Sequence, residues 1–122
     1  MRLQADVAGG RPFECLIAGD GELRRLNREF LGKDAPTDVL SFPSGTGEGR
    51  LGELAISADR ARAQAADHGH GVEDEIGILM LHGVLHLMGM DHERDRGAMR
   101  RAEGRFRKRL GLPLGLIERV AR

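Results

Sequence analysis

The stretch from His82 to His92, HGVLHLMGMDH, constrains this chain more than any other feature of its sequence. It holds three of the chain's five histidines. His82 and His86 are four residues apart, so on a helix both imidazoles project from one face, about one turn apart. Gly89 favours the left-handed conformation that ends a helix, and the resulting turn would bring His92 towards the other two rings. Three converging imidazoles suit Zn²⁺, which leaves a fourth position open at catalytic sites.

A bound metal explains these histidines better than simple burial does. Two imidazoles on a helix as apolar as IGILMLHGVLHLM would each need partners for both ring nitrogens. A metal meets that need for both rings at once, so we expect one Zn²⁺ per chain, bound by His82, His86 and His92. Histidine sites also suit Ni²⁺ and Cu²⁺, so the native metal stays open. The spacing matches that of metzincin peptidases, but Gly83 stands where those enzymes carry their glutamate base, which disfavours a peptidase.

Length and composition set further limits. The 122 residues fit one domain, residues 1–122. No apolar run is long enough to cross a membrane, and the N-terminus lacks the apolar core of a signal peptide, so we expect a cytoplasmic protein with no membrane partner. Net charge is zero, yet residues 93–109 hold eight Arg or Lys against three acidic residues. Such a segment either binds phosphate or forms a solvated helix face. The lone Cys15 is expected to be a buried strand thiol.

Hydrophobic patterning predicts an α+β fold. The expected strands cover 13–18, 38–43 and 51–57, and the expected helices cover 20–31, 58–67, 73–88 and roughly 95–110. The helix of residues 73–88 is apolar almost all round, so it should be the buried central helix. The tail after residue 110 is interrupted by Gly and Pro and is expected to pack irregularly. We therefore expect a small mixed sheet packed against a central buried helix that carries two metal-ligand histidines, with flanking helices.

The histidine stretch is similar, nearly letter for letter, to the signature of the YbeY family of bacterial endoribonucleases. Two further blocks agree with that family in the same order. They are LNREFLGKDAPTDVLSFP, residues 26–43, and LGELAIS, residues 51–57. The resemblance implies a Zn²⁺ bound by His82, His86 and His92, and cleavage of single-stranded RNA. It also implies a part in 16S rRNA 3′-end maturation and in ribosome quality control. The implied partners are an rRNA precursor and the small ribosomal subunit, and no DNA is expected.

The chain departs from the family pattern in two places. Family members usually begin with an additional strand and helix, and they commonly carry an arginine where this chain has Leu31. Phosphoryl transfer needs positive charge near the transition state, which Leu31 does not provide. Arg28 falls on the same helix face and is predicted as the catalytic replacement, with a solvated surface residue as the alternative. Lys33 is predicted to bind the substrate phosphate.

The leading hypothesis from the sequence is a zinc-dependent endoribonuclease, and two alternatives stay open. One is a ribosome-assembly binding protein with a structural metal, and the other is a metal-dependent hydrolase of another substrate. The attacking group is either water or the 2′-hydroxyl of the RNA. Asp91 either contacts a ligand imidazole or is a turn residue. Asp38 and Thr37 either shape the cleft or cap the second strand, whereas His68 and His70 are expected to be exposed rather than metal-bound.

Overall fold

The computed structural model describes residues 7–44, 49–91 and 95–120. The elements run in the order β1 (Phe13–Ala18), α2 (Asp20–Leu31), β2 (Val39–Pro43), β3 (Gly52–Ser57), α3 (Ala58–His68), α4 (Val72–Leu87), α5 (Ala98–Leu110) and α6 (Leu116–Val120). The strand order in the sheet is β1-β3-β2, with β3 parallel to β1 and antiparallel to β2. The predicted α+β fold with a small mixed sheet is confirmed.

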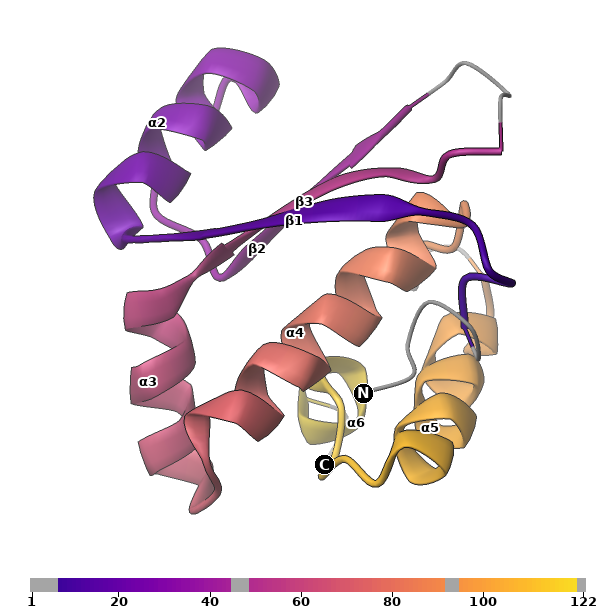
Figure 1. Ribbon diagram of the computed structural model, residues 1–122. Coiled ribbons are helices and arrows are strands. Elements are labelled where there is room, and N and C mark those ends of the chain that lie inside the picture. The colour runs from indigo at the N-terminus through magenta and orange to yellow at the C-terminus, as the bar shows by residue number, and fades with distance from the viewer. Residues whose placement is uncertain (1–6, 45–48, 92–94, 121–122) are drawn as a thin grey trace.

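The helices form unequal layers on the two faces of the sheet. In Figure 1, α2 lies on one side of the strands, and α4 crosses the other side with α3, α5 and α6 packed around it. The central strand β3 is buried on both faces. Leu54 and Ile56 share the face towards the α4 layer, and Ala55 packs with the α2 layer. The histidine helix therefore lies against the middle of the sheet.

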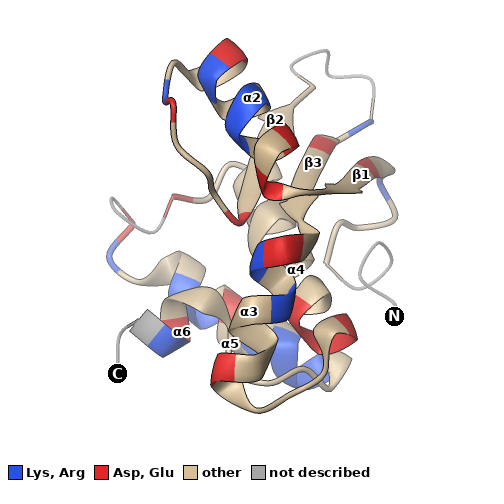
Figure 2. Ribbon diagram, turned by 90° about the vertical axis from the view of Figure 1, so that its left-hand side faces the viewer, with Lys and Arg blue, Asp and Glu red and all other residues tan. Residues whose placement is uncertain are grey.

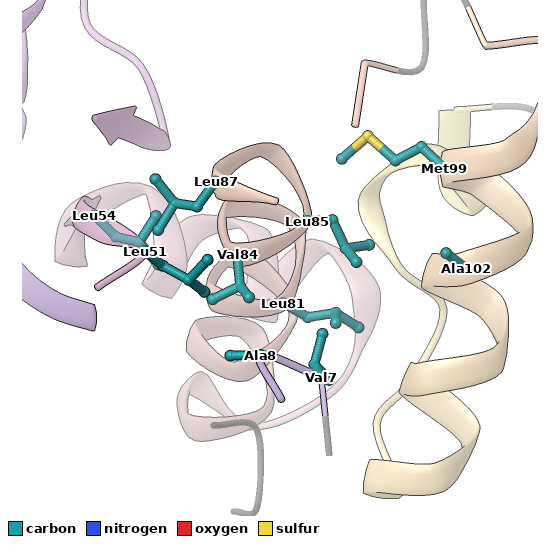
Figure 3. Packing of buried hydrophobic residues seen from close by; sticks show 10 residues of the cluster. All are labelled: Val7, Ala8, Leu51, Leu54, Leu81, Val84, Leu85, Leu87, Met99 and Ala102. Carbon is teal, nitrogen blue, oxygen red and sulfur yellow. The ribbon is translucent and has the colours of Figure 1, made fainter. Parts of the chain in front are cut away.

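The central helix α4 is buried as its composition predicts. Leu81, Val84 and Leu85 are fully buried. Figure 3 shows the α4 side chains of this cluster between Leu51 and Leu54 on one side and α5 residues on the other. Gly83 sets the distance between α4 and the sheet, since a Cβ there would lie 2.7 Å from Leu54 Cδ2. A larger residue would push the helix, and the histidines on it, away from the sheet.

Two helix ends follow from single residues, the start of α3 at Ser57 and the predicted end of α4 near Gly89. Ser57 caps α3, because its Oγ accepts a hydrogen bond from the Arg60 backbone N–H at 3.1 Å. After α4, Gly89 takes a left-handed conformation with φ of 91°. The Met90 N–H then donates to Leu85 O at 3.1 Å, which folds the chain back over the last turn of α4.

The structure corrects the prediction for the C-terminal tail, which is helical over α6 rather than irregular. The Gly and Pro residues that suggested irregular packing all precede Leu116, so they do not interrupt this helix. Polar contacts hold it in place. Glu118 accepts from the Gly115 N–H at 3.2 Å, and it pairs with Arg107 of α5 at 3.0 Å. The first contact is local, whereas the second joins α6 to α5, eleven residues earlier in the chain.

Three smaller predictions are also corrected. The helical pattern placed Phe30 on one apolar face with Leu23 and Leu26. Leu23 is buried, but Phe30 is 64% exposed and meets Phe42 edge to face, with 5.6 Å between ring centroids. Cys15 is half-buried rather than buried, because β1 is an edge strand, and this partial burial raises the pKa of the thiol. Helix α5 begins at Ala98, after a turn in which Asp95 accepts from the Met99 N–H at 2.8 Å.

Charged residues lie mostly on the outer surfaces of the helices. Figure 2 shows basic and acidic residues side by side along α2. On α5, five basic residues are exposed: Arg100, Arg101, Arg105, Lys108 and Arg109. This part of the basic segment is thus exposed to solvent, and phosphate binding by it stays a prediction. Among the helices described, none has the length and apolar composition needed to cross a membrane.

Candidate active site

The site is built on the last two turns of α4, where His82 and His86 lie one turn apart. Their Nε2 atoms are 3.1 Å from each other. The ring centroids are 4.7 Å apart and the ring planes meet at 77°. His82 is 8% exposed and His86 is half-buried, so most of the pair lies below the molecular surface. The predicted placement of the two imidazoles on one helix face is confirmed.

The opposite nitrogen of each ring is held by an acceptor from a different part of the chain. His82 Nδ1 lies 3.0 Å from Glu103 Oε2, and Glu103 is a fully buried residue of α5. His86 Nδ1 lies 2.9 Å from the backbone carbonyl of Met90. The left-handed turn at Gly89 places that carbonyl, so the glycine orients a ring as well as ending the helix.

These contacts fix the tautomer of each neutral ring. Carboxylate and carbonyl oxygens accept hydrogen bonds, so each neutral imidazole carries its proton on Nδ1 and a lone pair on Nε2. With both rings in this tautomer the two Nε2 lone pairs face each other at 3.1 Å, and either a shared proton or a shared cation satisfies them. Two nitrogens bound tetrahedrally to one Zn²⁺ lie about 3.3 Å apart. The geometry and chemistry of the pair therefore fit a shared metal ion.

The third predicted ligand, His92, lies outside the described residues. Within 7–44, 49–91 and 95–120, no group of three or more His, Cys, Asp or Glu side chains is placed to hold a metal. The three-ligand site stays a prediction. The turn at Gly89 does direct the chain back over α4 immediately before His92, as the sequence analysis expected.

A hollow of about 490 Å³ opens beside the two histidines. Edge strand β2 borders it, and the residues lining it are Leu31, Lys33, Asp38, Val39, Leu40, Ser41, Pro43, His82 and His86. Two positions singled out from the sequence, Leu31 and Lys33, are thus brought to the histidine pair. Lys33, in the loop after α2, is the cation that lines the hollow, and β2 lines most of one side.

Arg28, the other predicted cation, is not among the residues that line this hollow. Its side chain is 55% exposed, and its guanidinium lies 3.8 Å from the Asp34 carboxylate. Lys33 and Arg28 therefore differ in their position relative to the histidines. Lys33 lies in the wall of the hollow, whereas Arg28 points to the loop acid that follows α2.

The structure shows why Gly83 cannot serve as a substitute position for the peptidase base. A side chain there would enter the interface between α4 and the sheet, against Leu54 and 3.3 Å from Ser41 Oγ. The Gly83 carbonyl already accepts from Ser41 Oγ at 3.1 Å. This position faces the strands, so it offers no room for a carboxylate that reaches the imidazoles.

Asp38, Thr37 and Asp91 were left with two readings each. Asp38 Oδ1 accepts from the Val39 N–H at 2.8 Å, which caps the start of β2, and the same residue lines the hollow. Both readings of Asp38 thus hold for its position. Thr37 is half-buried just before β2, and Asp91 is exposed at the end of the Gly89 turn. Their roles stay predictions.

The two remaining histidines differ from each other. His68 is exposed, as expected. The expectation of exposure is wrong for His70, whose side chain is 13% exposed with Nε2 2.6 Å from Glu75 Oε1. Glu75 is fully buried and also accepts hydrogen bonds from both terminal guanidinium nitrogens of Arg119, at 3.0 and 2.9 Å. Burial raises the pKa of the Glu75 carboxyl, but the bonds from Arg119 and His70 outweigh it and leave the pKa below its ordinary value.

Sequence reasoning missed Glu103 and the Met90 carbonyl as partners of the imidazoles. For Glu103 a signal was present. It lies four residues after Met99 and three before Phe106, both predicted to face inward, so it falls on the apolar stripe of its helix. A carboxylate on such a stripe is rarely buried without a partner. The Met90 contact is made by the backbone, so no side-chain pattern points to it.

A small α+β domain with an oriented imidazole pair beside an open hollow is typical of a hydrolytic enzyme. The family model described as "Endoribonuclease YbeY" matches residues 3–111. A protein from Solibacter usitatus named Endoribonuclease YbeY is 68% identical over 119 residues, which cover 98% of this chain and 80% of that protein. The chain belongs to the endoribonuclease YbeY family.

Two more distant relatives agree. A protein of the same name from Koribacter versatilis is 50% identical over 121 residues, covering 99% of this chain and 78% of its own length. The solution structure of TM1509 from Thermotoga maritima matches with a TM-score of 0.55 and 28% identity. That match covers 77% of this chain, and the chain spans 64% of the length of that protein. The similarity therefore holds for both sequence and fold.

Proposed function

We propose that this chain is a metal-dependent endoribonuclease that acts on single-stranded RNA, with Zn²⁺ held by His82, His86 and His92. The observation that carries the proposal is the pair of Nε2 atoms 3.1 Å apart, each on a ring whose Nδ1 is fixed by an acceptor. Family membership and the names of the relatives support RNA as the substrate. An rRNA precursor, the small ribosomal subunit and ribosome quality control belong to the same proposal, as does a cytoplasmic location.

The residues of the chain divide the work. His82 and His86 bind the ion, and Glu103 and the Met90 carbonyl keep both rings in the tautomer that presents Nε2. Zn²⁺ at this position supplies Lewis acidity, which polarises a phosphoryl oxygen and acidifies water. Edge strand β2 forms one wall of the hollow, and we assign this hollow to the RNA strand.

Lys33 and Arg28 have different parts in this proposal. Lys33 lines the hollow, so we assign it a contact with the substrate phosphate. Arg28 is assigned the stabilisation of transition-state charge, which requires it to leave Asp34 when RNA binds. Lys33→Ala is expected to weaken RNA binding in a salt-dependent way. Arg28→Ala is expected to lower the cleavage rate by about 10²-fold with little change in binding. An unchanged rate in Arg28→Ala removes that residue from the mechanism.

The metal is tested by alanine substitutions at His82, His86 and His92, with His68→Ala as the matched control. Each of the three variants is expected to lose the single zinc equivalent and the cleavage of single-stranded RNA, because each removes one ligand. His68 is exposed and lies outside the hollow, so His68→Ala keeps both. Zinc is measured by elemental analysis of the purified protein. Full zinc content in His92→Ala would show that the three-ligand site is wrong.

Chelation separates a catalytic metal from a structural one. We expect the chain to lose RNA cleavage while it keeps its helical circular dichroism, because the buried α4 core holds the fold without the ion. Unfolding on chelation would favour the binding-protein alternative. A substrate panel tests the other alternative, a hydrolase of another substrate. The product ends identify the attacking group, since attack by the 2′-oxygen breaks the P–O5′ bond and leaves a 2′,3′-cyclic phosphate and a 5′-hydroxyl.

A further inference from the structure

Glu103 is the only carboxylate in the described part of the chain that contacts one of the two α4 imidazoles and a second helix at once. Its Oε2 lies 3.0 Å from His82 Nδ1. Its Oε1 accepts the backbone N–H of Ile117, in the first turn of α6, at 2.8 Å. The residue is fully buried, so these bonds replace the water that an ionised carboxylate would otherwise need.

This arrangement requires a carboxylate. Both partners of Glu103 are N–H donors, and an ionised carboxylate accepts at both of its oxygens. A glutamine of the same shape would accept one bond and present its NH₂ group to the other donor. If His82 kept its Nδ1–H tautomer, one buried donor would lose its partner, which costs about 1 to 3 kcal/mol, so the substitution favours the other tautomer.

Helix α6 closes over this carboxylate. Gly115 precedes the helix, and a Cβ at that position would overlap the Glu103 side chain. Two ion pairs hold α6 against the rest of the protein, Arg107 with Glu118 and Arg119 with Glu75. Ile117 also packs against the core cluster that surrounds α4. The family match ends at residue 111, so it assigns no role to this segment.

We propose that Glu103 is a positioning residue for His82 and that α6 holds Glu103 in place, which makes the C-terminal helix part of the active site. The carboxylate fixes His82 in the Nδ1–H tautomer and directs its Nε2 towards His86. Helix α6 donates to one carboxylate oxygen and packs against the Glu103 side chain. The part of this inference that concerns the metal rests on the proposed function, whereas the ring orientation does not.

The first experiment compares the native chain with Glu103→Gln by two readings. The ¹H–¹⁵N spectrum of the imidazoles in metal-free protein reports the tautomer of His82. Competition with a chromophoric chelator reports the affinity for Zn²⁺. We expect the Nδ1–H tautomer to lose its dominance and the zinc dissociation constant to rise by about 10- to 100-fold. An unchanged tautomer together with unchanged affinity overturns the role of Glu103.

The second experiment tests α6 with Glu103 left intact, and it also serves if Glu103→Gln does not fold. Gly115→Ala forces α6 and the carboxylate apart, so we expect weaker zinc binding and a changed His82 signal. Gly104→Ala is the matched control, because it adds the same methyl group beside Glu103 on α5, where the nearest non-local atom is 3.5 Å away. It should keep the native affinity. Equal affinity in Gly115→Ala and Gly104→Ala overturns the role of α6.

The two readings also separate this inference from the proposed function. If the native chain binds no zinc but the His82 tautomer changes in Glu103→Gln, the positioning role stands and the metal site is wrong. If the native chain binds zinc and neither reading responds to Glu103→Gln or Gly115→Ala, the metal site stands and the positioning role is wrong.

Discussion

Helices α2 and α4 cover opposite faces of one sheet, and they treat charge in opposite ways. On α2, Arg25 pairs with Glu22 and Glu29, and all three side chains are more than a third exposed. On α4, Glu75 pairs with Arg119 and His70 and is fully buried. The same kinds of ion pair thus stand in water on one face and inside the protein on the other.

Packing differs in the same direction. Helix α4 approaches the sheet so closely that Gly83 has no space for a Cβ, whereas α2 leaves Phe30 largely exposed beside an apolar groove of about 360 Å³. Close packing against β2 and β3 fixes the position of α4, and with it the place of both imidazoles relative to the sheet. On the face with the candidate site, therefore, single residues such as Gly83 and Glu75 determine the packing and the pairing of charges, whereas on the α2 face they do not.

The largest expected effect on stability comes from breaking the buried pair. Glu75→Gln leaves the guanidinium of Arg119, which is 9% exposed, without its counter-charge. Breaking a buried pair by removing one partner costs about 3 to 5 kcal/mol. Urea unfolding followed by circular dichroism measures the change in the free energy of unfolding. Asp34→Asn, which breaks the exposed contacts of Arg24 and Arg28, is the control and should hardly move the midpoint.

The same carboxylate predicts how stability changes in acid. The pKa of Glu75 in the folded chain lies below its ordinary value of 4.5. Between the folded and the unfolded pKa, the unfolded chain binds more protons than the folded chain. The contribution of the Glu75 carboxylate to the free energy of unfolding is therefore fully present above 4.5 and is lost as the pH falls through the folded pKa. Glu118, whose pKa is also lowered by Arg107 and Gly115 despite burial, adds to this loss. Urea midpoints from neutral pH to about pH 3 should fall less steeply in Glu75→Gln. A parallel fall in both chains would contradict the assignment.

A third prediction compares the same substitution on the two helices. Gly83→Ala places a methyl group 2.7 Å from Leu54 Cδ2, and overpacking of this kind costs about 1 to 3 kcal/mol. Gly21→Ala on α2 meets no atom within 4 Å and reduces the freedom of the unfolded chain, so it should stabilise by about 0.5 kcal/mol. Opposite signs in thermal or urea unfolding sharpen the contrast between the two helices. A cost at both positions would erase it.

Most of the fold could be predicted because its signals are local. The apolar run of α4, the glycine after it and the serine before α3 each specify their element from neighbouring residues alone. Phe30 was wrongly placed because helical periodicity gives its face but not where the sheet ends beneath it. Helix α6 was missed because Glu118 and the Ile117 N–H stabilise it through contacts with Arg107 and Glu103 of α5.

The site could be predicted in part for the same reason. His82 and His86 are separated by one helical turn, so the sequence alone places them together. The apolar stripe of α5 marks Glu103 as buried, but its contact with His82 forms only after α5 has packed on α4, 21 residues away in sequence, so no local pattern identifies the partner. The first residues of a site can thus be read from spacing, but the residues that orient them depend on tertiary packing.

The smallest expected effect is on the exposed face. Arg25 of α2 donates to Glu29 at 2.9 Å and also pairs with Glu22, and its side chain is 44% exposed. In water such pairs gain little, because the attraction is screened and two long side chains lose freedom. Arg25→Ala should therefore leave the urea midpoint nearly unchanged and should abolish what small salt dependence these pairs produce. The measurement is the midpoint at low and high salt for the native chain and the variant. A loss that approaches the one in Glu75→Gln would show that burial does not decide the difference between the two helices.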